Sequence, residues 1–256
     1  MKRLVSMGRG GVGKTTFVAL MTKYFLEIRE TPILLIDADP DQSLNEMVGI
    51  DLVKEGKKTI SDILFDVMGN KDIDSLSEVS VSKQERIMKK FNGEAWYEGE
   101  DFDSITLGVK WTEGCYCFPN AVLHRLFDEF SKNYEYVLID CPAGLEYLNR
   151  RVTSEVHDVF DILDPSRKSF DHVKRVKKII EDVKIQYQNI YVVGGFRFPR
   201  DLEREVEKQT GLKYLGAIVY DEQMAHSILT GLSLLDLPSN SPAYISVKEI
   251  MKEAGY

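Results

Sequence analysis

The chain has 256 residues, of which 43% are hydrophobic and 29% are charged, and its net charge is −8. A chain of this length can bury a core without disulfide or metal staples, and its composition argues against disorder. The negative charge argues against a surface that binds a phosphate backbone or an anionic membrane. We therefore expect a folded protein that binds neither nucleic acid nor membrane.

Cysteine content and hydropathy indicate the compartment. Three cysteines are too few for a disulfide scaffold, and the apolar stretch after Met1 is too short for a secretory signal. No run approaches the roughly 18 apolar residues of a membrane span. We expect a soluble, cytoplasmic protein whose thiols stay reduced and available to metals.

The predicted elements alternate between strands and helices from the N-terminus. A buried strand over residues 2–7 precedes a helix over 14–28 and a second apolar strand over 33–36. This order forms a βαβ unit with parallel strands. Further apolar runs and polar segments of helical spacing continue it, at 105–109, 136–139, 170–183, 190–193, 201–209 and 215–220. The pattern predicts an α/β fold in three layers, with one mostly parallel sheet and helices on both of its faces.

Residues 52–103 interrupt this alternation. They are rich in Lys, Glu, Asp and Ser and show no strong strand signal. We interpret them as a lid or interaction region inserted into a single domain that spans residues 1–256. A capped helix with Pro242 near its start is predicted over residues 241–254.

A glycine-rich loop lies between the first strand and the first helix. Residues 8–15 read GRGGVGKT and match the phosphate-loop pattern GxxxxGK[ST] of the P-loop NTPases. Its glycines let backbone N–H groups turn toward one anion, and the helix N-terminus adds positive field. We expect Lys14 to reach the β- and γ-phosphates and the Thr15 hydroxyl to hold Mg²⁺. The full nucleotide-binding set would be Gly10, Gly11, Val12, Gly13, Lys14, Thr15 and Thr16.

Three aspartates follow strand ends beside this loop. Asp37 and Asp39 come after the second strand, and Asp140 ends a later one. Ligands of parallel sheets bind at the carboxyl ends of the strands. A carboxylate there can hold a magnesium-bound water or orient the water that attacks the γ-phosphate. An aspartate at a strand end can also be a turn residue or a helix cap.

Residues 8–16 resemble the deviant Walker A motif of the MinD/ParA/nitrogenase-iron-protein class of ATPases, which usually reads KGGVGKT. The resemblance implies ATP as the nucleotide and a homodimer with two nucleotides at its interface. The first basic residue of the loop then reaches the phosphates of the partner. That position is Arg9 in this chain, which keeps the charge but carries a longer, planar fork.

The same resemblance implies further roles. Asp39 matches the aspartate that positions the hydrolytic water, and the segment after Asp140 matches switch II, which senses the γ-phosphate. The implied catalytic residues of the magnesium-dependent ATPase are Lys14, Asp39 and Arg9. The implied magnesium site comprises Thr15, Asp37 and Asp140, and switch II comprises Pro142, Ala143 and Gly144.

Within this class the chain is most similar to the CooC-type ATPases, which help to insert nickel into carbon monoxide dehydrogenase and acetyl-CoA synthase. The deciding segment is Gly114-Cys115-Tyr116-Cys117, which matches their Cys-x-Cys motif; residues 143–151, 164–167 and 234–238 are also similar. The likeness runs from residue 2 to about 245 and is weakest over 52–103. Residues 193–196 read VGGF where related proteins often place an adenine-reading asparagine, and residues 218–221 lack their proline.

The cysteines suggest a shared metal site. Cys115 and Cys117 supply two thiolates, whereas a closed zinc site needs four ligands, and two chains related by a twofold axis would supply them. Thiolates suit Zn²⁺ or Ni²⁺. The alternative is two buried free thiols. We expect Cys141 to be a core residue and His124 to be a solvated helix residue more than a further ligand.

The phosphate loop, the aspartates and the cysteines lead to three functional hypotheses. The leading hypothesis is an ATP-dependent metallochaperone, in which ATP closes the dimer, Cys115 and Cys117 of both chains capture nickel or zinc, and hydrolysis releases the metal to a client apo-enzyme. The client would be carbon monoxide dehydrogenase or acetyl-CoA synthase. A ParA/MinD-like switch on DNA or membrane would need a basic surface or an amphipathic membrane helix. An electron donor with a bridging four-iron cluster would place its cysteines far apart, unlike this pair.

Overall fold

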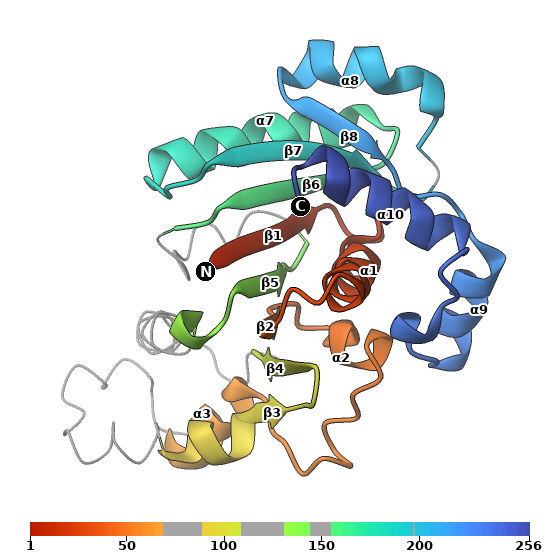
Figure 1. Cartoon of the computed structure of the whole chain (residues 1–256). Coiled ribbons are helices and arrows are strands. Elements are labelled where there is room, and N and C mark those ends of the chain that lie inside the picture. Colours follow the sequence, from red (N-terminus) through yellow and green to blue (C-terminus); the bar gives the residue numbers. More distant parts are fainter. Residues whose placement is uncertain (69–88, 109–130, 144–154, 197) are drawn as a thin grey trace.

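A single mixed sheet organises the chain (Figure 1). The computed structural model describes residues 1–68, 89–108, 131–143, 155–196 and 198–256. Over these residues the strand order is β3-β4-β2-β5-β1-β6-β7-β8, and every neighbouring pair is parallel except β3 with β4. The strands are β1 (Lys2–Gly8), β2 (Ile33–Asp37), β3 (Trp96–Glu98), β4 (Phe102–Thr106), β5 (Tyr136–Asp140), β6 (Asp158–Leu163), β7 (Asn189–Gly194) and β8 (Lys213–Ala217).

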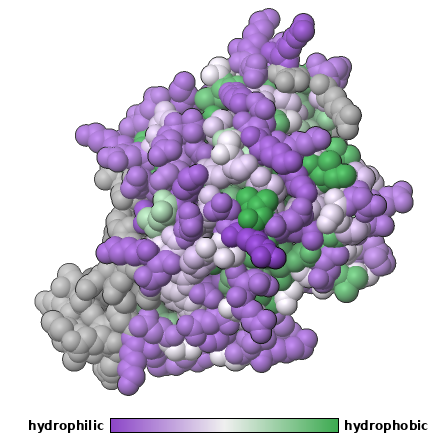
Figure 2. All heavy atoms as spheres, in the orientation of Figure 1, coloured by the Kyte–Doolittle hydropathy of each residue, from purple (hydrophilic) through white to green (hydrophobic). Residues whose placement is uncertain are grey.

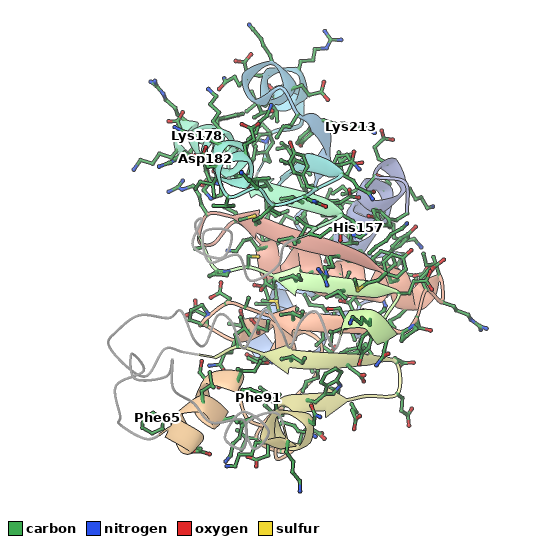
Figure 3. The ribbon with its side chains drawn as sticks, turned by 90° about the vertical axis from the view of Figure 1, so that its left-hand side faces the viewer. Phe65, Phe91, His157, Lys178, Asp182 and Lys213 are labelled. Carbon is green, nitrogen blue, oxygen red and sulfur yellow. The ribbon has the colours of Figure 1, made fainter. Side chains whose placement is uncertain are left out.

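Helices cover both faces of the sheet, which confirms the predicted three-layer α/β fold (Figures 1 and 3). One face carries α1 (Lys14–Glu27), α2 (Ser43–Met47), α9 (Glu222–Thr230), the 3₁₀ turn η5 (Leu234–Asp236) and α10 (Pro242–Glu253). The other carries α3 (Ile60–Met68), the π-helical turn η2 (Phe91–Ala95), α7 (Arg167–Asp182) and α8 (Glu203–Thr210). Two short 3₁₀ turns, η3 (Ser131–Asn133) and η4 (Arg200–Leu202), complete the described elements. No helix within the described ranges is both long enough and apolar enough to cross a membrane.

Alternation along the strands divides the core between the two faces. In β1, Leu4 packs with α1 and α10, whereas Val5 and Met7 pack with the α3 and α7 side. All three side chains are fully buried. Burial on both faces explains why the central strands read as continuous apolar runs in the sequence.

Strand β6 has no counterpart among the predicted apolar runs because Asp158 and Asp161 interrupt it. Both carboxylates are buried in the sheet. Asp158 accepts hydrogen bonds from the Asn189 amide at 2.8 Å and the Tyr256 hydroxyl at 2.5 Å. Asp161 lies 3.4 Å from Nδ1 of His172 on α7. These partners are distant in sequence, so a local pattern does not reveal that the two aspartates are buried in a strand.

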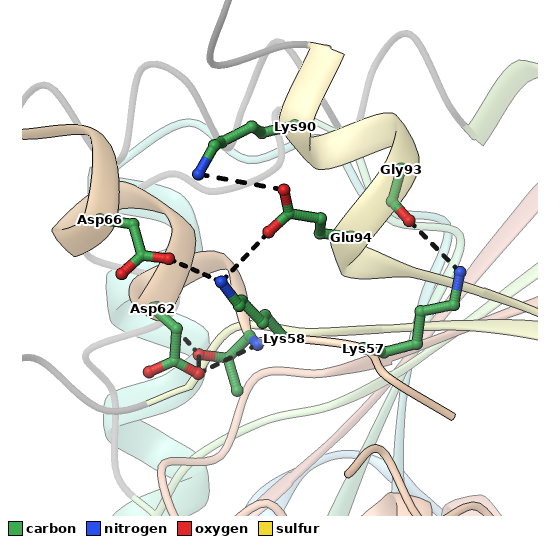
Figure 4. A network of polar contacts seen from close by, with 8 residues as sticks. Lys57, Lys58, Asp62, Asp66, Lys90, Gly93 and Glu94 are labelled. Atoms are coloured by element: carbon green, nitrogen blue, oxygen red, sulfur yellow. Dashed lines mark hydrogen bonds and ion pairs between the residues drawn. The ribbon is translucent and has the colours of Figure 1, made fainter. Parts of the chain in front are cut away.

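The stretch 52–103 contributes more to the sheet than its composition indicated. It contains β3 and the start of β4, and β4 pairs with β2 so that Ile33 faces Phe102. Lys58 joins α3 to η2, since its ammonium lies 2.7 Å from Asp66 and 3.3 Å from Glu94 (Figure 4). The sequence gives no strong strand signal here because β3 is short and is stabilised by pairing with β4. A lid role for this stretch stays a prediction.

One carboxylate joins the last two helices. Asp221 is the N-cap of α9 and accepts the backbone N–H of Gln223 at 2.8 Å and of Met224 at 3.4 Å. The hydroxyl of Ser241, the N-cap of α10, donates to the same carboxylate at 2.5 Å and accepts the Tyr244 N–H. Burial raises the pKa of Asp221, but these hydrogen bonds outweigh it and hold the pKa below its ordinary value. The ionised carboxylate therefore stabilises both helix starts.

We predict that Asp221→Ala lowers the free energy of unfolding by about 2 kcal/mol, through loss of the cap and of the buried hydrogen bonds. The folded-state pKa of Asp221 lies below its ordinary value of 3.8, so the stabilisation is complete above that pH. It is lost as the pH falls through the folded-state pKa, and the variant should approach wild type there. Urea denaturation at neutral and acidic pH measures this difference. Glu249→Ala on the exposed face of α10 is the control, and an equal effect of both substitutions would contradict the assignment.

Candidate nucleotide-binding site

The glycine-rich loop leaves β1 at its carboxyl end and runs directly into α1. Gly13 is the N-cap of α1 and has a φ of 101°, a left-handed value that favours glycine. A Cβ at Gly13 would also lie 2.8 Å from the ring of Phe196, in the loop after β7. The shape of the phosphate loop therefore depends on a glycine at this position.

Positive charge gathers inside this loop. Lys14 is buried, and its ammonium donates to the carbonyl oxygen of Arg9 at 3.3 Å, so it reaches back across the loop. The first turn of α1 contains no acidic side chain, so the positive end of the helix dipole is not opposed there. Backbone N–H groups, a helix N-terminus and an ammonium together make an anion site suited to phosphates.

Two buried aspartates face each other at the adjacent strand ends. Asp37 of β2 and Asp140 of β5 pair in register and are fully buried. The Thr15 hydroxyl donates to Oδ2 of Asp140 at 2.6 Å, while Oδ1 of Asp140 has no hydrogen-bond partner among the described residues. Both oxygens of Asp37 accept backbone N–H groups, from Asp39 and Leu44, each at 3.1 Å. Asp37 thus fixes the following loop, and Asp140 keeps an unused oxygen beside Thr15.

The electrostatics of this pair favour a bound cation. Burial raises the pKa of Asp37 to about 8, and the charge of Asp140 adds to that effect. Burial also raises the pKa of Asp140 to about 7, although the Thr15 hydrogen bond and Lys14 oppose the rise. A divalent cation would favour the ionised form of both groups. Carboxylate and hydroxyl oxygens form a donor set that suits Mg²⁺.

The loop after Asp37 is fastened at both ends. Asp39 is half-buried, and its carboxylate accepts the N–H of Asp41 at 3.1 Å. On α2, the buried Asn45 donates to the Thr106 hydroxyl at 2.5 Å and accepts from the Ser104 hydroxyl at 2.8 Å. These bonds join α2 to β4. The loop that carries Asp39 is therefore held between β2 and β4.

Arg9 is held within its own chain. Its guanidinium lies 3.0 Å from Asp164 and 3.2 Å from the hydroxyl of Ser166, the N-cap of α7. Burial raises the pKa of Asp164, but hydrogen bonds from Ser166 and Ser169 and the charge of Arg9 bring it below its usual range. In the sequence, residues 164–167 are distinguished only by their similarity to the CooC-type ATPases. No sequence signal connects them to Arg9, because the contact spans 155 positions.

The remaining predicted residues divide between described and undescribed parts of the chain. Ala143, after Pro142, lies against the phosphate loop, since a Cβ at Gly10 would be 3.7 Å from its Cβ. Cys141 is buried as predicted, and burial raises the pKa of its thiol. Three predicted site residues and one alternative ligand lie outside the described residues: Gly144, Cys115, Cys117 and His124. Within the described ranges no group of three or more His, Cys, Asp or Glu side chains could hold a metal, so Mg²⁺ would depend on the nucleotide's phosphates for further ligands.

Comparisons with known proteins agree with this geometry. The family described as an AAA domain matches residues 4–192. An uncharacterised ATP-binding protein of Methanocaldococcus jannaschii is 34% identical over 248 residues, which cover 96% of this chain and 95% of that protein. The carbon monoxide dehydrogenase accessory protein CooC of Rhodospirillum rubrum is 23% identical over 251 residues, or 94% and 91% of the two chains. A solved ParA family ATPase from Chlorobium tepidum shares the fold, with a TM-score of 0.70, 16% identity and full coverage of both chains.

We predict that Lys14→Ala weakens ATP binding by about 100-fold, because charge-assisted hydrogen bonds of a buried ammonium contribute up to about 3 kcal/mol. Titration with a fluorescent ATP analogue measures the affinity. Lys213→Ala is the matched control, since Lys213 forms an exposed ion pair with Glu253 at 2.6 Å and should leave the affinity unchanged. Equal affinities of the two variants would show that Lys14 does not contact the nucleotide.

Proposed function

Because the chain belongs to the family of the AAA domain, whose model it matches over residues 4–192, we propose that it hydrolyses ATP with Mg²⁺ as cofactor. One observation carries this proposal. The Thr15 hydroxyl lies 2.6 Å from Asp140, whose other oxygen has no partner among the described residues, next to the buried ammonium of Lys14. A phosphate loop beside such an oxygen pair is the arrangement that nucleotide hydrolysis requires.

Each group has a proposed task. Lys14 and the loop backbone of Gly10, Gly11, Val12 and Gly13 bind the phosphates, with Thr16 following in the same turn. Thr15 and Asp140 hold Mg²⁺, and Asp37 positions the Asp39 loop through its two backbone hydrogen bonds. The chemistry supplied by bound Mg²⁺ is neutralisation of charge on the β- and γ-phosphates. Asp39 orients the attacking water, and Pro142, Ala143 and Gly144 sense whether the γ-phosphate is present.

A homodimer completes the proposed site. Arg9 would leave Asp164 and Ser166 and contact the phosphates of the partner's nucleotide. The pair with Asp164 is half-exposed, so exchanging it for a phosphate costs little free energy. ATP therefore favours the dimer by offering Arg9 a stronger anion than the one it holds in its own chain.

Beyond ATP hydrolysis, we propose that the protein is a metallochaperone that delivers nickel or zinc to carbon monoxide dehydrogenase or acetyl-CoA synthase. Its support is the Cys-x-Cys segment at Cys115 and Cys117 together with a 23% identical relative whose name is that of a carbon monoxide dehydrogenase accessory protein. Two chains would supply the four thiolates of a closed site, with the metal as cargo. The alternative, a ParA/MinD-like switch that positions a partner on DNA or membrane, shares the same fold. The fold alone does not choose between them.

We predict opposite effects for the two members of the Arg9–Asp164 pair. Arg9→Ala should lower ATP hydrolysis by about 1,000-fold, the low end of what an arginine supplied in trans contributes. Asp164→Asn should raise the dimer fraction at limiting ATP by up to about fivefold, since a half-exposed pair contributes at most about 1 kcal/mol. Sedimentation with ADP and with ATP measures the dimer. Arg175→Ala on the exposed face of α7 should change neither quantity, and loss of dimer in Asp164→Asn would contradict the exchange.

We predict that ATP-bound wild type takes up about one Ni²⁺ or Zn²⁺ per dimer. Cys115→Ala/Cys117→Ala should take up none and should still bind ATP. Equilibrium dialysis followed by elemental analysis measures the metal. Cys141→Ala is the control, since Cys141 is buried in the core and should leave uptake intact. Negligible uptake by wild type and double variant alike would exclude the metal role without touching the ATPase proposal.

A further inference from the structure

Three strongly exposed apolar side chains lie on or beside α9. Val53 and Leu229 are 87% and 84% exposed, and Leu232 is 54% exposed. Figure 2 shows apolar residues next to charged ones on the side of the molecule where α9 lies. Large apolar side chains in a cluster, in contrast to single ones, indicate a contact surface.

Leu232 is exposed, although an apolar residue directly after a glycine helix cap usually packs onto the helix. Gly231 ends α9 with a φ of 69°, and the N–H of Leu232 donates to the carbonyl of Ser227 at 2.9 Å. After such a glycine cap, an apolar residue normally packs back onto its own helix. Here the leucine stays half in solvent, so the local helix end does not account for its side chain.

Two grooves meet at this helix end. One, of about 470 Å³, lies between α9 and η5 and is lined by Leu232, Leu237 and Pro238. The other, of about 480 Å³, lies between α2 and residues 50–54 and is lined by Val53 and Gly231. The two walls touch, because a Cβ at Gly49 would lie 3.2 Å from Ser233. The grooves form one surface, here named the α2–α9 surface and defined by the lining residues Glu46, Val53, Glu222, Leu232 and Asp236.

The rim of the α2–α9 surface is acidic. Glu222 and Asp236 line the first groove, and Glu46 and Asp51 line the second. Of the described residues that line the two grooves, Lys54 is the single lysine or arginine, and its ammonium is paired with Asp51 at 3.0 Å. The two grooves are thus lined by four carboxylates and one ammonium, with apolar side chains between them. This charge complements a basic partner and repels anionic lipid or nucleic acid.

We infer that the α2–α9 surface docks a segment of another protein in which apolar side chains are flanked by lysine or arginine. A second copy of the chain fits less well, since an isologous contact would bring eight carboxylates together across a twofold axis. The inference goes beyond the proposed function and depends neither on metal binding nor on ATP hydrolysis.

Three synthetic peptides of about 16 residues test the chemistry. The first has leucines at helical spacing i, i+3, i+4 and i+7 with lysines between them. The second replaces the lysines by glutamates, and the third replaces the leucines by serines. Fluorescence anisotropy should show that the first binds at least about tenfold more tightly than either other, with an affinity that falls as salt rises.

Variants locate the binding to the surface. Leu232→Lys should weaken the leucine–lysine peptide by at least about tenfold, as expected for an apolar anchor that lines the first groove. Asp236→Asn should weaken it less and reduce its salt dependence. Tyr187→Lys is the matched control, because Tyr187 is an exposed apolar side chain between α7 and β7, outside the surface. Thermal unfolding of each variant verifies that it is folded.

The outcomes separate the occupants. Equal binding of the lysine and glutamate peptides, or equal effects of Leu232→Lys and Tyr187→Lys, would overturn the inference. A change in the solution mass of Leu232→Lys without peptide would assign the surface to a second copy. Binding to vesicles of anionic lipid that Leu232→Lys abolishes would assign it to a membrane. Either of these results would also overturn docking of a basic segment.

Discussion

The structure depends on two carboxylates that face each other across neighbouring parallel strands. Asp37 and Asp140 lie in register at the carboxyl ends of β2 and β5, beside the strand that enters the phosphate loop. Burial makes their simultaneous ionisation costly without a cation. Backbone N–H groups occupy both oxygens of Asp37 and the Thr15 hydroxyl occupies one oxygen of Asp140, so the other Asp140 oxygen is the one in this pair that has no hydrogen-bond partner among the described residues. The surrounding sheet serves to keep this pair in place.

The parts of the site that lie close together in sequence could be predicted from the sequence. The phosphate loop, Thr15 and the strand ends at Asp37 and Asp140 follow local rules of glycine spacing and strand termination, and the three-layer fold follows from the alternation of elements. The contact between Arg9 and Asp164 could not be predicted, since it joins the loop after β1 to the start of α7 across 155 positions. Strand β6 could not be predicted for a related reason. The partners of its carboxylates, Asn189, Tyr256 and His172, come close to them only in the folded sheet.

The 52–103 stretch shows how polar composition can hide structural function. Its strand β3 is short and its surface is charged, yet β3 pairs with β4, whose Ser104 and Thr106 lie just after the stretch and hold Asn45. The stretch is therefore connected through β4 to the loop that carries Asp39. Buried polar contacts of this kind depend on complete pairing, which makes the connection sensitive to single substitutions.

The two edges of the sheet limit how the molecule can assemble. β3 has three residues and runs antiparallel to β4, which leaves little main chain for another strand to pair with. At the opposite edge, β8 begins with the exposed Lys213, and a register shift opposite Val192 and Gly194 distorts its pairing with β7. Short, charged or irregular edges resist strand addition. Both edges formed by the described strands are therefore poor templates for extending the sheet into a second chain.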